Sequence, residues 1–217
     1  VLALDCSGAA CSAALWLDGA LAAERFAAMA RGQAEALMPQ IRDVMTEGGL
    51  DFSALDVIAT TVGPGSFTGL RLGLAAARGL ALAAVRPLVA VTAFEALLAG
   101  LSDERRGARM VAVAIDSRRG PVFVQLFDTS RSPVESPVSI DPTELDRWLP
   151  PDALVVVTDT ALPPMGPDRL LCRAAIHAGD IARLAAGFGS SGIGRLAPVP
   201  LYLRAPDVTL PQRKTLL

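Results

Sequence analysis

The stretch Thr60-Thr-Val-Gly-Pro-Gly-Ser-Phe-Thr-Gly-Leu-Arg-Leu-Gly-Leu-Ala-Ala-Ala-Arg-Gly79 decides the fold, because it joins a strand to a helix through a glycine-rich turn. The β-branched run 57–62 predicts a buried strand, which Gly63-Pro-Gly65 ends. Ser66 or Thr68 then caps a helix that we expect to reach about Ala84.

Within this helix, glycine and alanine recur every four residues and leave one face almost without side chains. A second backbone can approach such a face closely, so we expect the helix to dock against an equivalent helix of a partner. Two arginines seven residues apart lie on nearly the same side and are expected to pair with acidic groups at the rim. The predicted interface residues are Gly69, Leu70, Arg71, Gly73, Leu74, Ala77, Arg78 and Ala81.

The turn before the helix has a second interpretation. A glycine turn at a helix N-terminus presents backbone N–H groups and the positive end of the helix dipole to an anion such as phosphate. The spacing matches neither Gly-x-x-x-x-Gly-Lys-Ser/Thr nor Gly-x-Gly-x-x-Gly, so a turn whose glycines serve only packing stays open as well.

Length and composition bound the class of protein. A chain of 217 residues with 52% hydrophobic residues suits one or two compact domains with a sizeable core. We find no uninterrupted apolar run of about 18 residues and no leader pattern, so we expect a cytoplasmic protein without membrane contact. The net charge of −2 excludes a broad basic surface that could grip a nucleic-acid backbone by itself.

Cysteine and histidine limit the chemistry further. Cys6, Cys11 and Cys172 form no C-x-x-C pair, which argues against a disulfide framework or a structural zinc site. We expect them to be buried small side chains in a reducing compartment. One histidine, His177, excludes a two-histidine metalloprotease site, and Ser66 does not lie in a Gly-x-Ser-x-Gly elbow. We therefore predict no catalytic and no metal-binding residues.

The chain order indicates an internal duplication. The first half reads β-β-β-α-β-α-β-α, and it opens with the strand 1–5 followed by a hairpin at Asp18-Gly19. After a polar segment, the strand 110–116 again ends in aspartate and is followed by a second strand at 122–127. This pattern resembles actin-like (ASKHA) α/β folds, which have a ribonuclease H-like motif in each of two lobes, and it predicts lobes at 1–104 and 105–217. The candidate residues of a vestigial phosphate loop in such a fold are Asp5, Ser7, Gly63, Gly65, Ser66 and Asp116.

Five segments together resemble the TsaB (YeaZ) family nearly from end to end. They are Leu2-Ala-Leu-Asp-x-Ser7, Cys11-Ser-Ala-Ala-Leu-Trp16, Gly63 to Gly73 with Gly79-Leu-Ala-Leu82, Ala114-Ile-Asp-Ser-Arg118 and Pro200-Leu-Tyr-Leu-Arg204. The resemblance implies a non-catalytic scaffold subunit of the machinery that makes N6-threonylcarbamoyladenosine (t6A) at position 37 of tRNA. It implies pairing with the catalytic relative TsaD, recruitment of the ATPase TsaE, contact with tRNA through the complex, and a homodimer in isolation.

Three departures from the family pattern bear on cofactors. Gln33 stands where many members have histidine, Pro121 lies where the second-lobe loop often has glutamate and tyrosine nearby, and 158–161 lack a glycine-rich turn. We therefore expect no tightly bound cofactor, with ATP and Mg²⁺ held only in an assembled complex. The alternative from a different class is an autonomous actin-like ATPase that uses Asp5, Ser7, Asp116 and the turn 63–69.

Overall fold

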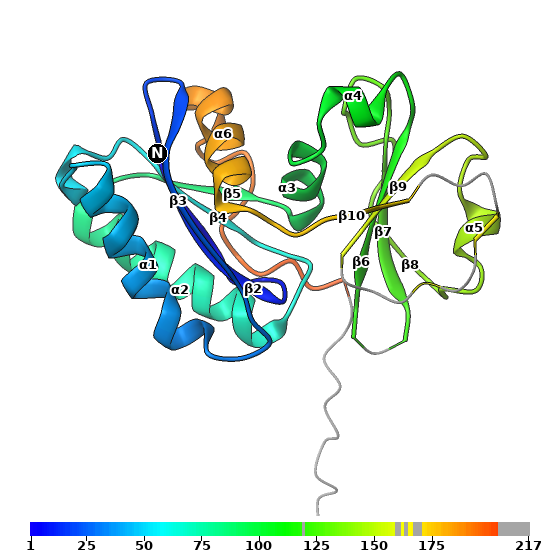
Figure 1. Ribbon diagram of the computed structural model, residues 1–217, viewed down its shortest axis with the longest axis horizontal. Coiled ribbons are helices and arrows are strands. Elements are labelled where there is room, and N and C mark those ends of the chain that lie inside the picture. Colours follow the sequence, from blue (N-terminus) through cyan, green and yellow to red (C-terminus); the bar gives the residue numbers. More distant parts are fainter. Residues whose placement is uncertain (119, 159–161, 163–164, 167–170, 204–217) are drawn as a thin grey trace, which may run out of the picture.

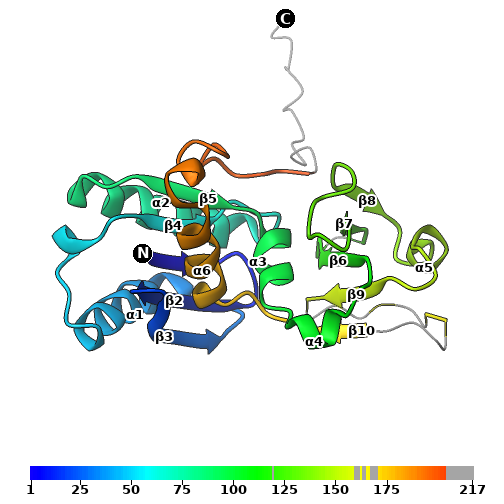
Figure 2. The same ribbon diagram turned by 90° about the horizontal axis from the view of Figure 1, so that it is seen from above.

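The computed structural model describes residues 1–118, 120–158, 162, 165–166 and 171–203 and contains two five-stranded sheets, seen apart in Figures 1 and 2. The first sheet has the order β3-β2-β1-β4-β5. Its strands are β1 (Leu2–Asp5), β2 (Ala10–Leu17), β3 (Ala20–Ala28), β4 (Ile58–Thr61) and β5 (Leu88–Val91).

The second sheet has the order β10-β9-β6-β7-β8. Its strands are β6 (Val111–Asp116), β7 (Val122–Phe127), β8 (Val138–Ile140), β9 (Leu154–Val157) and β10 (Leu171–Arg173). In both sheets the first strand of the lobe is central, antiparallel to the second strand and parallel to the fourth. The repeated topology confirms the predicted duplication and the actin-like two-lobe fold.

Helices cover both faces of the first sheet. On one face lie α1 (Gln33–Glu47) and α2 (Phe67–Ala84), which pack on the side chains of Leu2, Leu4 and Ile58. The other face carries α3 (Ala93–Ala99) and α6 (Ala178–Phe188). The helix α3 starts at a capping box formed by Thr92 and Glu95.

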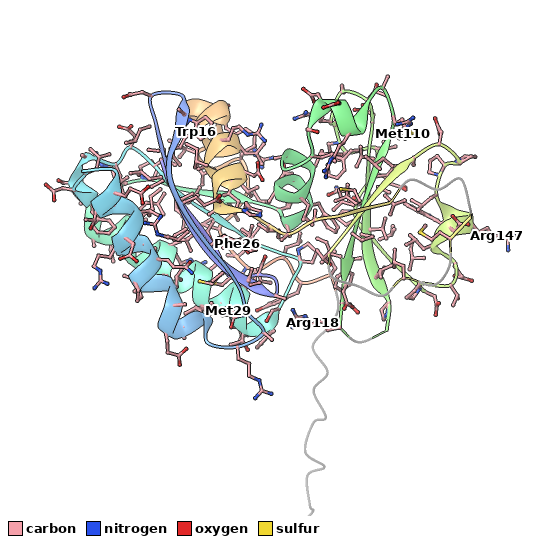
Figure 3. All side chains as sticks on the ribbon, in the orientation of Figure 1. Trp16, Phe26, Met29, Met110, Arg118 and Arg147 are labelled. Carbon is pink, nitrogen blue, oxygen red and sulfur yellow. The ribbon has the colours of Figure 1, made fainter. Side chains whose placement is uncertain are left out.

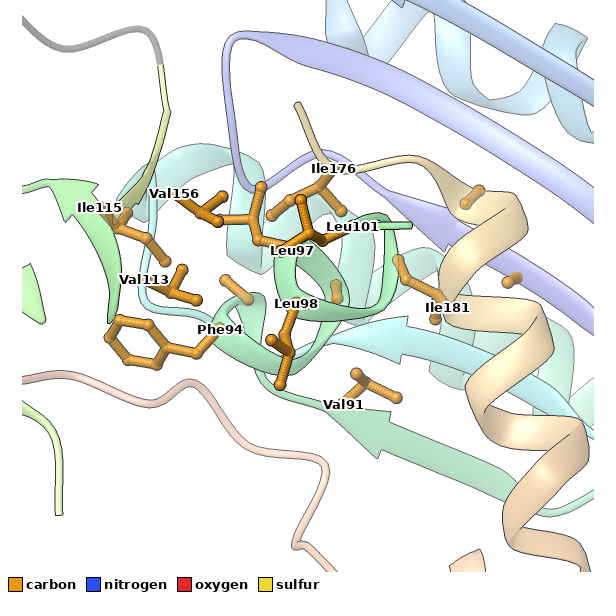
Figure 4. Close-up of a cluster of buried hydrophobic side chains, with 14 of the residues drawn as sticks. Val91, Phe94, Leu97, Leu98, Leu101, Val113, Ile115, Val156, Ile176 and Ile181 are labelled. Atoms are coloured by element: carbon orange, nitrogen blue, oxygen red, sulfur yellow. The ribbon is translucent and has the colours of Figure 1, made fainter. Parts of the chain in front are cut away.

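Helix α3 joins the lobes into one core. Figure 4 shows Phe94 beside Val113 of the second sheet, while Leu98 of the same helix lies toward Val91 of the first. The opposite face of the second sheet packs on α5 (Leu145–Trp148). The remaining helical turns are α4 (Asp103–Arg106), η1 (Phe52–Ala54) and η2 (Gly189–Gly192).

Helix α6 follows the second sheet in the chain but packs on the first. Its N-terminal amides are capped from strands β2 and β3: Ala178 N–H donates to Ser12 Oγ at 3.1 Å, and Gly179 N–H donates to Glu24 Oε1 at 2.9 Å. His177 stacks on Phe26 with ring centroids 4.3 Å apart, so the single histidine helps to hold this junction. The boundary near residue 104 stays a prediction.

Three short elements of the second lobe were not foreseen in the sequence as the structure has them. Strands β8 and β10, three residues each, were not predicted, because they are too short to show a periodicity. The sequence Pro142 to Trp148 after Asp141 is typical of a capped helix, but α5 begins only at Leu145. The Asp141 carboxylate accepts hydrogen bonds from the Thr143 amide and hydroxyl and so forms a turn instead of a cap.

By length and composition, α2 is the one helix in the described part of the chain that could cross a membrane. Buried core helices of soluble domains meet the same criterion, and the small-residue face of α2 packs on the first sheet.

Candidate partner-binding surface and phosphate loop

The turn that precedes α2 is built by close backbone packing. Ser66 is the N-cap residue, and its Oγ accepts a hydrogen bond from the Gly69 amide at 3.4 Å, which decides between the two predicted caps. A Cβ atom at Gly65 would lie 2.4 Å from the Ser7 carbonyl oxygen, and one at Gly69 would lie 1.9 Å from the Cys6 carbonyl oxygen. Glycine is therefore required at both positions so that the loop after β1 can lie against α2.

Four of the predicted phosphate-loop residues meet at this turn. The Ser66 amide donates to the Ser7 carbonyl at 2.7 Å, and the Ser7 amide donates to Asp5 Oδ1 at 3.1 Å. Gly65 lies against Ser7. The amides of Ser7, Ser66 and Gly69, which a phosphate would need, already have partners inside the chain.

Asp5 is buried and also accepts a hydrogen bond from the Thr61 hydroxyl. Its Oδ2 is buried without a hydrogen-bond partner, and burial raises the pKa of this carboxyl group although the Thr61 hydrogen bond opposes the shift. The Asp5 carboxyl group is therefore enclosed between β1, β4 and the loop after β1. In the described residues, no group of three His, Cys, Asp or Glu side chains could hold a metal ion.

The other two predicted loop residues have separate roles. Gly63 adopts φ +105° and lies against Leu70 and the Leu201 backbone. Asp116 ends β6 as Asp5 ends β1, and it repeats the local hydrogen bond to the amide two residues later, here that of Arg118 at 2.6 Å. Residues 159–161 of the predicted glycine-poor turn lie outside the described residues. Together these contacts do not fit a private nucleotide site, and the autonomous ATPase is not favoured.

The small-residue face of α2 packs inside this chain. Gly69, Leu70, Gly73, Leu74, Ala77 and Ala81 are buried within this chain and contact no solvent-facing surface. Gly73, for example, lies over Thr60 and Leu4. A stripe of small residues permits close approach to any backbone, and here that backbone is the chain's own sheet. A role for these six residues in binding a partner stays a prediction.

Arg71 and Arg78 were predicted to pair with acidic groups at the rim of an interface, and in this chain both are exposed and bind the C-terminal segment. Arg71 Nε donates to the Tyr202 hydroxyl at 3.1 Å, and its guanidinium lies 3.7 Å from the centroid of the Phe67 ring. Arg78 Nη2 donates to the Pro198 carbonyl. Sequence reasoning missed this segment as a neighbour of α2, because no local pattern links positions more than 100 residues apart.

The C-terminal end of α2 carries two large, exposed apolar residues, of which Val85 was not singled out from the sequence. Leu82 is 82% exposed and Val85 is 84% exposed. Val85 is the C-cap and has φ +54°, a left-handed conformation that β-branched residues rarely adopt. Glycine is the usual residue at such a helix end. The absence of glycine at the end of the predicted helix is the sequence signal that could have drawn attention to Val85.

Comparisons with known proteins agree with this fold. Residues 27–151 match the family model described as TsaD, tRNA N6-adenosine threonylcarbamoyltransferase. The tRNA threonylcarbamoyladenosine biosynthesis protein TsaB of Escherichia coli is 37% identical over 123 residues, which are 57% of this chain and 52% of that protein. A tRNA N6-adenosine threonylcarbamoyltransferase of Erythrobacter litoralis is 46% identical over 76 residues, 34% of this chain and 22% of that protein.

Among solved structures, YeaZ from Pseudomonas aeruginosa has a TM-score of 0.78 and 31% sequence identity to this chain. The match covers 93% of this chain and 98% of the YeaZ chain. The match to the Escherichia coli relative, by contrast, spans about half of that protein's length.

Proposed function

This chain belongs to the TsaB (YeaZ) family, and we propose that it is a non-catalytic subunit of the complex that makes t6A in tRNA. The observation that carries this proposal is the structural likeness to YeaZ over 93% of the chain at 31% identity. In this proposal the chain works in the cytoplasm, binds the TsaD counterpart and supports threonylcarbamoyl transfer to adenosine 37. TsaE and tRNA join through the complex, and the isolated chain forms a homodimer.

The occupied turn amides support a scaffold role over nucleotide chemistry in this chain. Ser66 caps α2 and donates to the Ser7 carbonyl, so the contacts of this residue are accounted for without a ligand. ATP and Mg²⁺ then belong to the assembled complex, where other chains contribute ligands.

We place the TsaD-binding surface on the solvent-facing side of α2, where Val85 gives the sharpest argument. A valine in the left-handed region costs about 1–2 kcal/mol relative to glycine. Its side chain is 84% exposed and so recovers little of this energy by burial inside the chain. Strained residues of this kind persist where they serve a function. Exposed apolar side chains such as those of Val85 and Leu82 mark surfaces that a partner protein covers.

The test compares binding of the purified TsaD counterpart to three versions of the full chain. Val85→Gly removes the apolar side chain at a position where glycine fits the backbone, so this variant stays folded while its affinity for TsaD falls at least about tenfold. Val134→Gly, at another exposed valine in the second lobe, is the matched control and binds like the wild type.

Urea unfolding of each variant verifies that it is folded, and tRNA modification by the reconstituted complex is the functional readout. Unchanged TsaD affinity of folded Val85→Gly would refute this surface. Failure of the wild-type chain to support modification with TsaD and TsaE would refute the proposed function.

A further inference from the structure

Two thiols of the first lobe lie in contact below helix α1. The sulfur atoms of Cys6 and Cys11 are 3.6 Å apart, and both residues are buried, with 1% and 0% of their surface exposed. They come from the end of β1 and the start of β2, on the sheet face that α1 and α2 cover. The proposed scaffold function uses neither thiol.

The strand register places these residues directly opposite each other. Asp5 pairs with Ser12 in the antiparallel β1–β2 ladder, so the next position along the ladder sets Cys6 against Cys11. Opposed residues in such a ladder have Cα atoms about 4.5 or 5.5 Å apart. Both separations lie within the range of about 4.4–6.8 Å that disulfides occupy. To form a disulfide, the two sulfur atoms must approach from 3.6 Å to about 2.05 Å. The spacing of the strands already suits this bond.

The two thiols differ in reactivity. The hydrogen bond from Cys6 lowers the pKa of the Cys11 thiol, and the same hydrogen bond, together with burial, raises the pKa of Cys6. The thiolate is the nucleophile in thiol oxidation, and Cys11 is also the thiol that lies next to the first turn of α1, so we assign the first step to Cys11.

Cys11 is the thiol that lies next to the start of α1. Its Sγ lies 4.0 Å from the Gln33 carbonyl oxygen, in the first residue of that helix. The N-cap residue of α1 is Gly32, so no side chain caps its first turn. Met29, labelled in Figure 3, marks the start of the short loop that connects β3 to this turn. An uncapped first turn opens more readily than the helix interior, and such local opening admits a small oxidant.

We propose that Cys6 and Cys11 are a modification site at which hydrogen peroxide forms a reversible intramolecular disulfide beneath the first turn of α1. The Cys11 thiolate attacks one peroxide oxygen, the O–O bond breaks, and the leaving hydroxide takes a proton to become water. Cys6 sulfur then attacks the sulfenic sulfur of Cys11, the S–O bond breaks, and a second water leaves with the Cys6 proton. Two thiols lose two electrons, and one peroxide is reduced to two waters.

The experiment exposes the reduced full chain to hydrogen peroxide, alkylates the remaining thiols in denaturant and digests with trypsin. The first basic residue is Arg25, so Cys6 and Cys11 fall in one peptide, 1–25, and Cys172 falls in another. We expect peptide 1–25 without alkyl groups and lighter by two hydrogens than its free-thiol form. Dithiothreitol added before alkylation restores two alkyl groups.

Single variants test the order of the steps. In Cys6→Ser, the remaining Cys11 forms a sulfenic acid that dimedone traps, whereas in Cys11→Ser the remaining Cys6 stays reduced under the same exposure. Two alkyl groups on wild-type peptide 1–25 after peroxide would overturn the proposal. So would stable addition of oxygen to either sulfur, or a cross-link from either cysteine to Cys172.

Discussion

Arg71 Nε donates a hydrogen bond to the Tyr202 hydroxyl at 3.1 Å and so ties helix α2 to a residue 131 positions later in the chain. The rings of Phe67 and Tyr202 stack with centroids 5.6 Å apart, and the Arg71 guanidinium lies on the Phe67 ring. One residue before Tyr202, the Leu201 amide donates to the Val62 carbonyl at 2.7 Å. The contacts of Arg71 thus hold the segment around Leu201 and Tyr202, whose backbone is hydrogen-bonded to Val62 just after β4.

Removal of the Arg71 guanidinium is expected to loosen this segment without unfolding the lobe. In Arg71→Ala, the Leu201 amide exchanges with solvent about fivefold faster or more, because exposed contacts of this kind contribute about 1 kcal/mol. Hydrogen exchange followed by NMR measures the rate. Arg147→Ala, an exposed arginine of α5 labelled in Figure 3, is the control and leaves the exchange at Leu201 unchanged. Equal exchange in both variants would show that Arg71 does not hold the segment.

Two glycines of α2 are expected to respond oppositely to alanine. In Gly69→Ala, the new Cβ lies 1.9 Å from the Cys6 carbonyl oxygen, so the free energy of unfolding falls by about 1–3 kcal/mol or more. Gly79 is exposed, and a Cβ atom there would meet no atom within 4 Å. Gly79→Ala therefore raises the free energy of unfolding by about 0.5–1 kcal/mol, because alanine has the higher helix propensity. Urea titrations of both variants measure the difference, and a stable Gly69→Ala would contradict the close packing of this turn.

Replacement of the strained C-cap is expected to stabilise the protein. Val85→Gly relieves about 1–2 kcal/mol of backbone strain. The greater freedom of glycine in the unfolded state offsets about 0.5–1 kcal/mol of this, so the free energy of unfolding rises by about 0.5–1 kcal/mol. Ala83→Gly, two residues earlier in the helix, lacks the strain and loses about 0.5–1 kcal/mol. The midpoint of urea unfolding decides the matter, and a lower midpoint for Val85→Gly would show that Val85 stabilises the isolated chain.

Asp5 gives the protein a defined dependence on pH. Burial raises the pKa of Asp5 in the folded state above its value of 3.8 in the unfolded state. Between these two pKa values the folded state binds more protons, so this group makes the free energy of unfolding fall as pH rises from about 3.8 through the folded pKa. In Asp5→Asn this contribution is absent, while the amide oxygen can still accept the Ser7 hydrogen bond.

The measurement is the difference in unfolding free energy between wild type and Asp5→Asn across pH 3.8 and above. We expect the variant to gain stability relative to the wild type as pH rises. A difference that does not change with pH would mean that Asp5 titrates alike in both states.

The sequence by itself determined the local structure and its repetition. The alternation of strand and turn residues, the Asp18-Gly19 hairpin and the aspartates that end β1 and β6 were enough to predict two lobes of one topology. Periodicity and capping act over a few residues, so these signals can be read without knowledge of the rest of the chain.

Only the tertiary structure decided which surfaces are free. The small-residue face of α2 could serve a partner or the chain's own sheet equally well, and the position of Gly73 over Thr60 assigned it to the sheet. The return of α6 to the first sheet, the binding of Arg71 to Tyr202 and the contact of Cys6 with Cys11 were likewise not predicted. Each depends on which distant segments pack together, because burial is a property of the whole fold and not of a local pattern.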